Sequence, residues 1–174
     1  MSEFMLTDEE TFAFCDSSSA QSCAKAVEDL EDYLKAEGPY DGVMAFSMGA
    51  TFVLSWMARK SLENKDSNSF QLPFRVGIFF ANAGPLLDYD LSSSGSVKVL
   101  DSAALEELIK IPTVHVWGTG DPDKENAALA SQACKGKEKS VFVHGRGHEV
   151  PTAIETVIPI AKVINRAIIQ ADCY

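Results

Sequence analysis

The sequence lacks any run of about 18 consecutive apolar residues, which is the length that a membrane-spanning helix needs. Residues 1–10 (MSEFMLTDEE) include four acidic side chains and no apolar stretch of signal-peptide length. We therefore expect neither a membrane partner nor a secretion signal. The simplest location is a reducing compartment, the cytoplasm, with the nucleus as an alternative.

Basic residues and cysteines are also scarce. The chain has 15 Lys and Arg against 25 Asp and Glu, a formal net charge of −10, and no basic cluster. This charge balance argues against a nucleic-acid partner. The four cysteines contain no Cys-x-x-Cys pair and no spacing with histidine that suits zinc. We expect free thiols, no metal site and no cofactor; the cysteines are Cys15, Cys23, Cys134 and Cys173.

Short apolar runs alternate with segments of helical periodicity along the chain. This alternation predicts one α/β domain over residues 1–174, with a mostly parallel sheet and helices on both faces. A chain of this length can bury roughly 68–70% of its unfolded surface, which is enough for such a layered core. The predicted strands are 42–46, 75–81, 112–117 and 140–143, and the predicted helices are 50–62, 102–108, 125–134 and 151–171.

Other segments carry weaker signals. An amphipathic helix with Cys23, Val27, Leu30 and Leu34 on one face should end near residue 38, where Gly-Pro follows. Residues 11–15 are a candidate edge strand, and residues 86–99 are interpreted as an aperiodic surface excursion, typical of a lid. In the last helix, the apolar stripe should consist of Ile154, Val157, Ile158, Ala161, Ile164 and Ile168.

The turn at Ser47 is the most informative feature of the sequence. An apolar strand leads into it and a strongly helix-forming segment follows, as in a nucleophile elbow. Such an elbow needs small residues two positions before and after the serine, and these are Ala45 and Gly49. Glycine usually occupies both positions, so Ala45 is a departure of one methyl group. The alternative is an ordinary strand-to-helix turn of another α/β fold.

A serine hydroxyl is a weak nucleophile and needs a base and an acid to become reactive. In α/β-hydrolases these follow in the order serine, acid, histidine. His148 lies in a loop between the fourth strand and the last helix, and we predict it as the base. His144 is the nearest rival, and His115 is more typical of a packed core histidine. The acid should follow a strand between Ser47 and His148, which indicates Asp121, with Asp123 as the fallback. The alternatives for these acids are a plain surface turn or a weak cation loop, although the segment lacks the twelve-residue spacing of an EF-hand.

Four segments of the chain resemble the FSH-type serine hydrolases, relatives of the ovarian-cancer-associated esterase. They are residues 38–50 (GPYDGVMAFSMGA), 74–80 (FRVGIFF), 111–121 (IPTVHVWGTGD) and 144–151 (HGRGHEVP). The resemblance extends from about residue 20 onward. It implies an α/β-hydrolase fold with Ser47 as nucleophile, Asp121 as acid and His148 as base. The chain looks most like the fungal thioesterases that release polyketides, which implies a role in secondary metabolism.

The chain departs from the family pattern before the elbow. Family members begin with a strand and a Leu-His-Gly-type loop whose backbone N–H is half of the oxyanion hole, and no such segment precedes Ser47 here. The N–H of Met48 can supply one donor. We therefore expect an N-terminally shortened fold with an uncovered sheet edge. Three explanations stay open: a shortened gene product, a misassigned start, or a protein that has given up catalysis.

These observations lead to three hypotheses for function. The first is a serine hydrolase of a small acyl ester or thioester, presented in one version by a polyketide synthase. The second is a non-catalytic binding module on the same fold, and the third is a flavodoxin-like domain whose serine turn binds an anion. If the first is right, four residues at and just after the end of the second strand are candidates for an acyl pocket: Phe80, Asn82, Pro85 and Leu86.

Overall fold

A four-stranded parallel sheet forms the frame of the molecule, with the strand order β1-β2-β5-β6. The computed structural model describes residues 13–16, 19–67, 69–89 and 96–173. All four predicted strands are confirmed, with ends that shift by about one residue. The strands are β1 (Gly42–Phe46), β2 (Val76–Phe80), β5 (Thr113–Gly118) and β6 (Lys139–His144).

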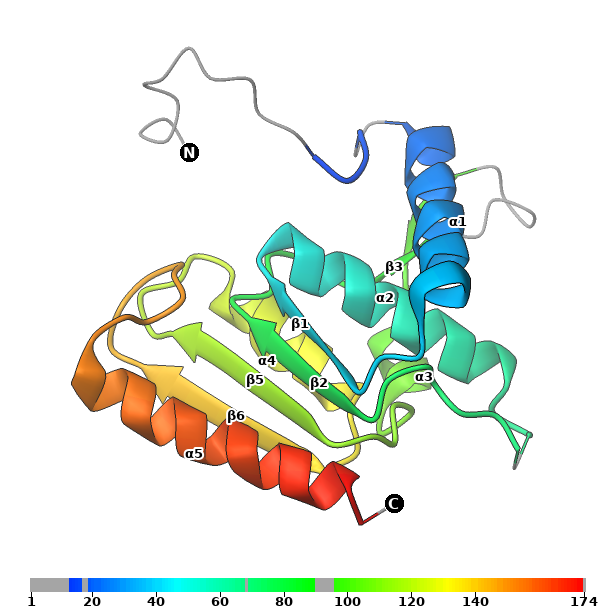
Figure 1. Cartoon of the computed structure of the whole chain (residues 1–174). Helices are drawn as coiled ribbons and strands as arrows, with labels where there is room; N and C mark the ends of the chain where they lie inside the picture. Colours follow the sequence, from blue (N-terminus) through cyan, green and yellow to red (C-terminus); the bar gives the residue numbers. More distant parts are fainter. Residues whose placement is uncertain (1–12, 17–18, 68, 90–95, 174) are drawn as a thin grey trace.

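Helices cover both faces of this sheet (Figure 1). On one face lie α2 (Met48–Glu63) and α4 (Lys124–Gln132), and on the other lies α5 (Ile154–Ala171). The long helix α1 (Ala20–Glu37) packs beside α2, and the short helix α3 (Ser102–Leu105) lies next to α4. The predicted layered α/β arrangement is therefore confirmed.

The two faces of the sheet have separate hydrophobic cores. Leu54, Met57 and Phe79 belong to the cluster beneath α2, whereas Val116 and Ile160 belong to the cluster beneath α5. Every residue of β2 and β5 is buried, as expected of central strands covered on both sides. Each fully buried large apolar side chain contributes about 1.5–3 kcal/mol, so the apolar residues of these central strands contribute strongly to the stability of the fold.

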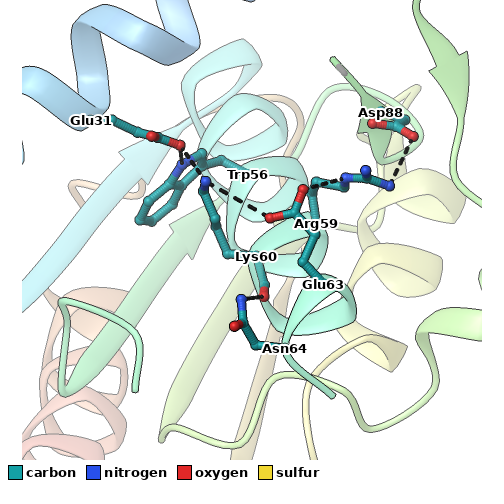
Figure 2. Close-up of polar contacts among 7 residues, drawn as sticks. All are labelled: Glu31, Trp56, Arg59, Lys60, Glu63, Asn64 and Asp88. Carbon is teal, nitrogen blue, oxygen red and sulfur yellow. Dashed lines mark hydrogen bonds and ion pairs between the residues drawn. The ribbon is translucent and has the colours of Figure 1, made fainter. Parts of the chain in front are cut away.

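Charged side chains fasten α1 and strand β3 (Leu87–Asp88) to α2 (Figure 2). Glu31 of α1 accepts a hydrogen bond from the Trp56 indole at 3.0 Å and lies 2.7 Å from the Lys60 ammonium. Next to Lys60 in the sequence, Arg59 lies 2.9 Å from Glu63, one turn further along α2, and 3.4 Å from Asp88 of β3. The ion pairs thus connect three elements across the outer side of α2.

Three local predictions need correction. The segment 86–99 is not wholly irregular, because β3 pairs antiparallel with β4 (Lys98–Val99), joining Leu87 to Val99; residues 90–95 lie outside the described residues. The predicted strand at 11–15 is absent from its described part, residues 13–15, and residues 11–12 lie outside the described residues. The predicted stripe of α5 is mostly exposed. The buried residues of α5 are Ile160, Ala167 and Ala171.

Strand β1 lies at the edge of the sheet, and within the described residues it pairs only with β2. Its side chains alternate: Val43 and Ala45 pack against the core beneath α2, while Met44 and Phe46 are 64% and 42% exposed. The predicted open sheet edge is therefore present in the part of the chain that the structure describes. In that same part, none of the helices combines the length and apolar character needed to cross a bilayer.

Candidate active site

Ser47 sits between β1 and α2 in a strained backbone conformation. Its φ of 56° and ψ of −125° lie in a region that residues other than glycine rarely adopt. The strain is held from both sides, since the Ser47 N–H donates to the Phe80 carbonyl at 2.9 Å and the Ser47 carbonyl accepts from Thr51 N–H at 3.1 Å. This is the geometry that the nucleophile-elbow prediction requires. The turn directs the hydroxyl away from the sheet toward the loops at its carboxyl edge.

The structure brings Ser47, His148 and Asp121 together from three different loops. The distance from Ser47 Oγ to His148 Nε2 is 2.7 Å, and His148 Nδ1 lies 3.0 Å and 3.1 Å from the two carboxylate oxygens of Asp121. An ionised carboxylate only accepts hydrogen bonds, so Nδ1 must carry the proton in this contact. Nε2 is then free to accept from the Ser47 hydroxyl.

Asp121 is held firmly behind the histidine. It is 1% exposed, and its Oδ1 also accepts a hydrogen bond from the Asp123 N–H at 2.8 Å. The Asp123 side chain turns instead to Asn126, whose amide donates to it at 3.0 Å. Asp123, the fallback for the acid, thus lies behind Asp121 and does not replace it beside His148.

Two loops carry the acid and the base, and backbone hydrogen bonds join them. Thr119 N–H donates to the His144 carbonyl at 2.8 Å, and Gly120 N–H donates to the Arg146 carbonyl at 2.9 Å. The loops lie close together at Gly118. A Cβ atom there would lie 2.0 Å from the Arg146 oxygen, so only glycine fits between them. The sequence shows this glycine, but its packing role depends on contacts that the fold creates.

The two rival histidines lie elsewhere. His144 ends β6, is 5% exposed, and accepts a hydrogen bond at Nδ1 from the Arg146 N–H at 3.3 Å. Burial, the largest cause, lowers the pKa of His144. His115 lies inside β5, 2% exposed, with its ring 5.4 Å from that of Phe79. Burial and the nearby Lys139 lower the pKa of His115 to about 3, as suits a neutral core side chain.

The same site supplies a set of metal-ligand atoms. One donor atom each from Asp121, Asp123 and His148 lies within 4.8 Å of the others. However, His148 Nδ1 and the Asp121 carboxylate already bond to each other, and Nε2 faces Ser47. The hydrogen-bond geometry therefore accounts for this cluster without an ion.

Two aromatic side chains near the site were not anticipated from the sequence. The Phe46 ring lies 5.2 Å from the His148 imidazole, and the Phe46 side chain is 42% exposed. Phe14 lies over the start of α2, where it stacks on Phe52 at 6.1 Å and approaches Gly49. An apolar residue that precedes the serine was visible in the sequence, but only the fold shows that Phe46 contacts the base.

Met48 is the first residue of α2, where backbone N–H groups have no partner within the helix. Its N–H is therefore available beside Ser47, at the place where a developing oxyanion would need a donor. Among the described residues before Ser47, none supplies a Leu-His-Gly loop.

The four predicted acyl-pocket residues do not form one wall. Phe80 is buried in the core beneath α5, whereas Leu86 is buried in the core beneath α2. Asn82 is 3% exposed and donates to the Gly84 carbonyl within its own turn at 2.6 Å, and Pro85 is exposed. The prediction grouped these residues by their place in the sequence, but the chain turns between Phe80 and Leu86, so their side chains enter different cores.

Comparisons with known proteins extend over most of the chain. Residues 3–160 match the family model described as serine hydrolase (FSH1), so the resemblance starts earlier than residue 20. Esterase FPY3 of Fusarium mangiferae is 33% identical over 171 residues, covering 97% of this chain and 75% of that protein. Hydrolase phiM of a fungal species is 32% identical over 130 residues, and the match covers 75% of this chain and 59% of phiM.

Solved structures show the same fold at lower sequence similarity. The acyl-protein thioesterase 2 of Zea mays superposes with a TM-score of 0.53 at 16% identity, over 86% of this chain and 66% of that structure. The predicted α/β-hydrolase fold is thereby confirmed. The chain spans about two thirds of that structure and less than two thirds of phiM.

Proposed function

We propose that this chain, which belongs to the serine hydrolase (FSH1) family, cleaves a small carboxylic ester or thioester through an acyl-enzyme on Ser47. The single observation that carries the proposal is the contact of 2.7 Å between Ser47 Oγ and His148 Nε2, with Asp121 bonded to the other ring nitrogen. A strained serine, a base and an orienting acid in this order are the parts that acyl transfer needs.

The reaction would run in two halves. His148 Nε2 takes the hydroxyl proton as Ser47 Oγ attacks the substrate carbonyl, and the imidazolium then gives that proton to the leaving alcohol or thiol. Asp121 stabilises the imidazolium through Nδ1–H. Water attacks the acyl-enzyme in the second half, with His148 again as base, and releases a carboxylic acid and free Ser47.

The Met48 N–H is the proposed donor to the tetrahedral oxyanion. Loss of one oxyanion donor lowers turnover on the order of 10²–10³ in other serine hydrolases. With one donor from the described residues, we expect slow turnover of activated esters and intact labelling of the nucleophile.

A labelling experiment tests the proposal. A fluorophosphonate probe should modify the purified protein at Ser47, and Ser47→Ala should stay unlabelled with no hydrolysis of p-nitrophenyl butyrate. Ser61→Ala, on the far end of α2, is the matched control and should label like the parent. An unlabelled parent, or equal labelling of Ser47→Ala, would contradict the proposal and favour the non-catalytic binding module.

The leaving group is the finer part of the proposal. We propose that the preferred substrates are thioesters, including an acyl thioester presented by a polyketide synthase. The test compares a thioester with an oxygen ester of the same acyl group. The motif resemblance to fungal polyketide-releasing thioesterases supports it. Faster acyl-enzyme formation from a butyryl thioester than from ethyl butyrate is the expected result, and the reverse order identifies a plain esterase. Addition of EDTA should leave either rate unchanged.

A further inference from the structure

A cavity lies at the opposite end of the sheet from Ser47. Its volume is about 480 Å³, within the range of small-molecule sites. It is lined by residues that precede strands, such as Phe74 before β2 and Pro112 before β5, and by the end of α2 at Asn64. Since the five residues of β2 span about 16 Å, this cavity is separate from the proposed catalytic site.

Much of the cavity wall is apolar. Phe70, Leu72, Leu108 and Ile111 line it and are only partly buried, and Phe74 behind them is 4% exposed. The Phe74 ring packs edge-on against Trp56 at 6.0 Å, which ties the wall to the core. A wall of this kind can bury a hydrocarbon chain, at roughly 0.8 kcal/mol for each methylene group removed from water.

The charged residues that line the cavity are all basic. The described lining residues include four cations and no carboxylate, although acids outnumber bases by 25 to 15 in the whole chain. Two of the cations are engaged: Arg75 donates to the Ala171 carbonyl and pairs with Asp172 at 3.1 Å, and Lys135 lies 3.5 Å from Glu138.

Lys65 and Lys110 differ from these two. Both are exposed at the cavity, and within the described part of the chain neither has an ion-pair partner. Two such ammonium groups beside an apolar wall, in an otherwise acidic protein, offer a local attraction for an anion.

We propose that this cavity binds a single-chain amphiphile with an anionic head group, whose chain packs against the apolar wall while its head lies beside Lys65 and Lys110. The site does not depend on the proposed hydrolase activity, because it uses none of the residues near Ser47. Lysine ammonium groups act as point charges, so the head can be a carboxylate or a phosphate.

Calorimetry with decanoate, decyl phosphate and decan-1-ol, below their micellar concentrations, tests the proposal. We expect one molecule of an anionic amphiphile to bind per chain, and to bind more tightly than decanol. Whichever of decanoate and decyl phosphate binds more tightly identifies the preferred head group. The Lys65→Glu, Lys110→Glu double variant should weaken that binding at least about tenfold, since two attractions become repulsions. Lys162→Glu, an exposed lysine of α5, makes a change of the same kind away from the cavity and should bind like the parent.

Two outcomes would overturn the proposal: no binding of either anion, or equal binding by the double variant and the parent. A diazirine analogue of decanoate then locates the ligand. Crosslinks to residues 70–75 or 108–112 support the cavity, whereas crosslinks near Ser47 place the ligand in the catalytic site and reject it. Because Ser47→Ala should bind decanoate unchanged, failure of the proposed catalysis leaves this test valid.

Discussion

At the residue scale, the distance between the proposed acid and base depends on a position that carries no functional group. Gly118 lies where the loop of Asp121 meets the loop of His148, and a Cβ there would lie 2.0 Å from one backbone oxygen and 2.5 Å from another. Backbone atoms cannot move aside as a side chain can. A methyl group at this position must separate the two loops.

We therefore predict that Gly118→Ala lowers kcat for an activated ester by about 10²-fold, the cost of a misplacement of about 1 Å. Gly145→Ala is the matched control in the neighbouring loop, because a Cβ there meets nothing within 4 Å. Steady-state kinetics and circular dichroism on both variants check the prediction. Full activity in a folded Gly118→Ala protein would show that the loops adjust without cost.

A second residue-scale prediction concerns His115, whose pKa falls from 6.5 to about 3 through burial and Lys139. Below pH 6.5 the unfolded chain binds a proton at this site that the folded chain excludes. Stability from this residue is thus complete above pH 6.5 and declines as the pH falls toward 3, by about 1 kcal/mol per pH unit. Urea unfolding at pH 7 and pH 5 should show a shallower decline in His115→Leu than in the parent. Equal declines would mean that the site is accessible to protons when folded.

The three proposed catalytic residues could be predicted from the sequence, but the residues that hold them in place could not. Ser47 had a recognisable turn, and with three histidines in the chain the choice of base was narrow. Their order along the chain then selected Asp121. Phe46, which contacts the base, gave no such signal, because its contact with His148 spans about 100 residues of sequence and exists only in the folded chain.

At the element scale, Glu31 connects α1 to α2 through Trp56 and Lys60 (Figure 2). Glu31→Ala leaves the buried Trp56 N–H without its acceptor, and we expect a loss of about 1 kcal/mol in the free energy of unfolding. Glu31→Gln can still accept from the indole and should lose less. Glu28→Ala, with a side chain 70% exposed on the same helix, should change stability by under about 0.5 kcal/mol. Denaturant unfolding measures all three, and equal losses in Glu31→Ala and Glu28→Ala would contradict the role.

The element predictions failed where periodicity allows two answers. Helix α5 has apolar side chains on most of its circumference, so the sequence identifies the helix without identifying the face that packs. The small Ala167 and Ala171 let α5 approach the sheet beside Ile160, and the predicted Ile154 and Ile158 remain 72% and 49% exposed. The sequence did not predict the pairing of β3 with β4 for another reason. Strands of two residues are too short to show any period.

At the scale of the whole molecule, an open sheet edge lies next to exposed apolar side chains. Within the described residues, β1 has a hydrogen-bonded neighbour on one side only. Met44 is exposed on the face of the sheet where α5 lies, because α5 covers β2, β5 and β6 and does not extend over β1 (Figure 1). Unpaired edge strands with apolar neighbours promote association between chains. The net charge of −10 opposes association, and 0.1 M salt screens the repulsion between charges more than about 10 Å apart.

We therefore predict that the protein self-associates more strongly as salt is added, through the β1 edge. Met44→Lys places a charge on that edge and should raise the monomer fraction at high salt. Leu129→Lys adds the same charge to an exposed apolar position of α4, on the other face of the sheet, and should leave association unchanged. Light scattering after size-exclusion chromatography at low and high salt compares the three proteins. If both lysine variants dissociate equally, net charge controls the association. If neither dissociates, the contact between chains lies away from β1. Either result would contradict the prediction that association uses the β1 edge.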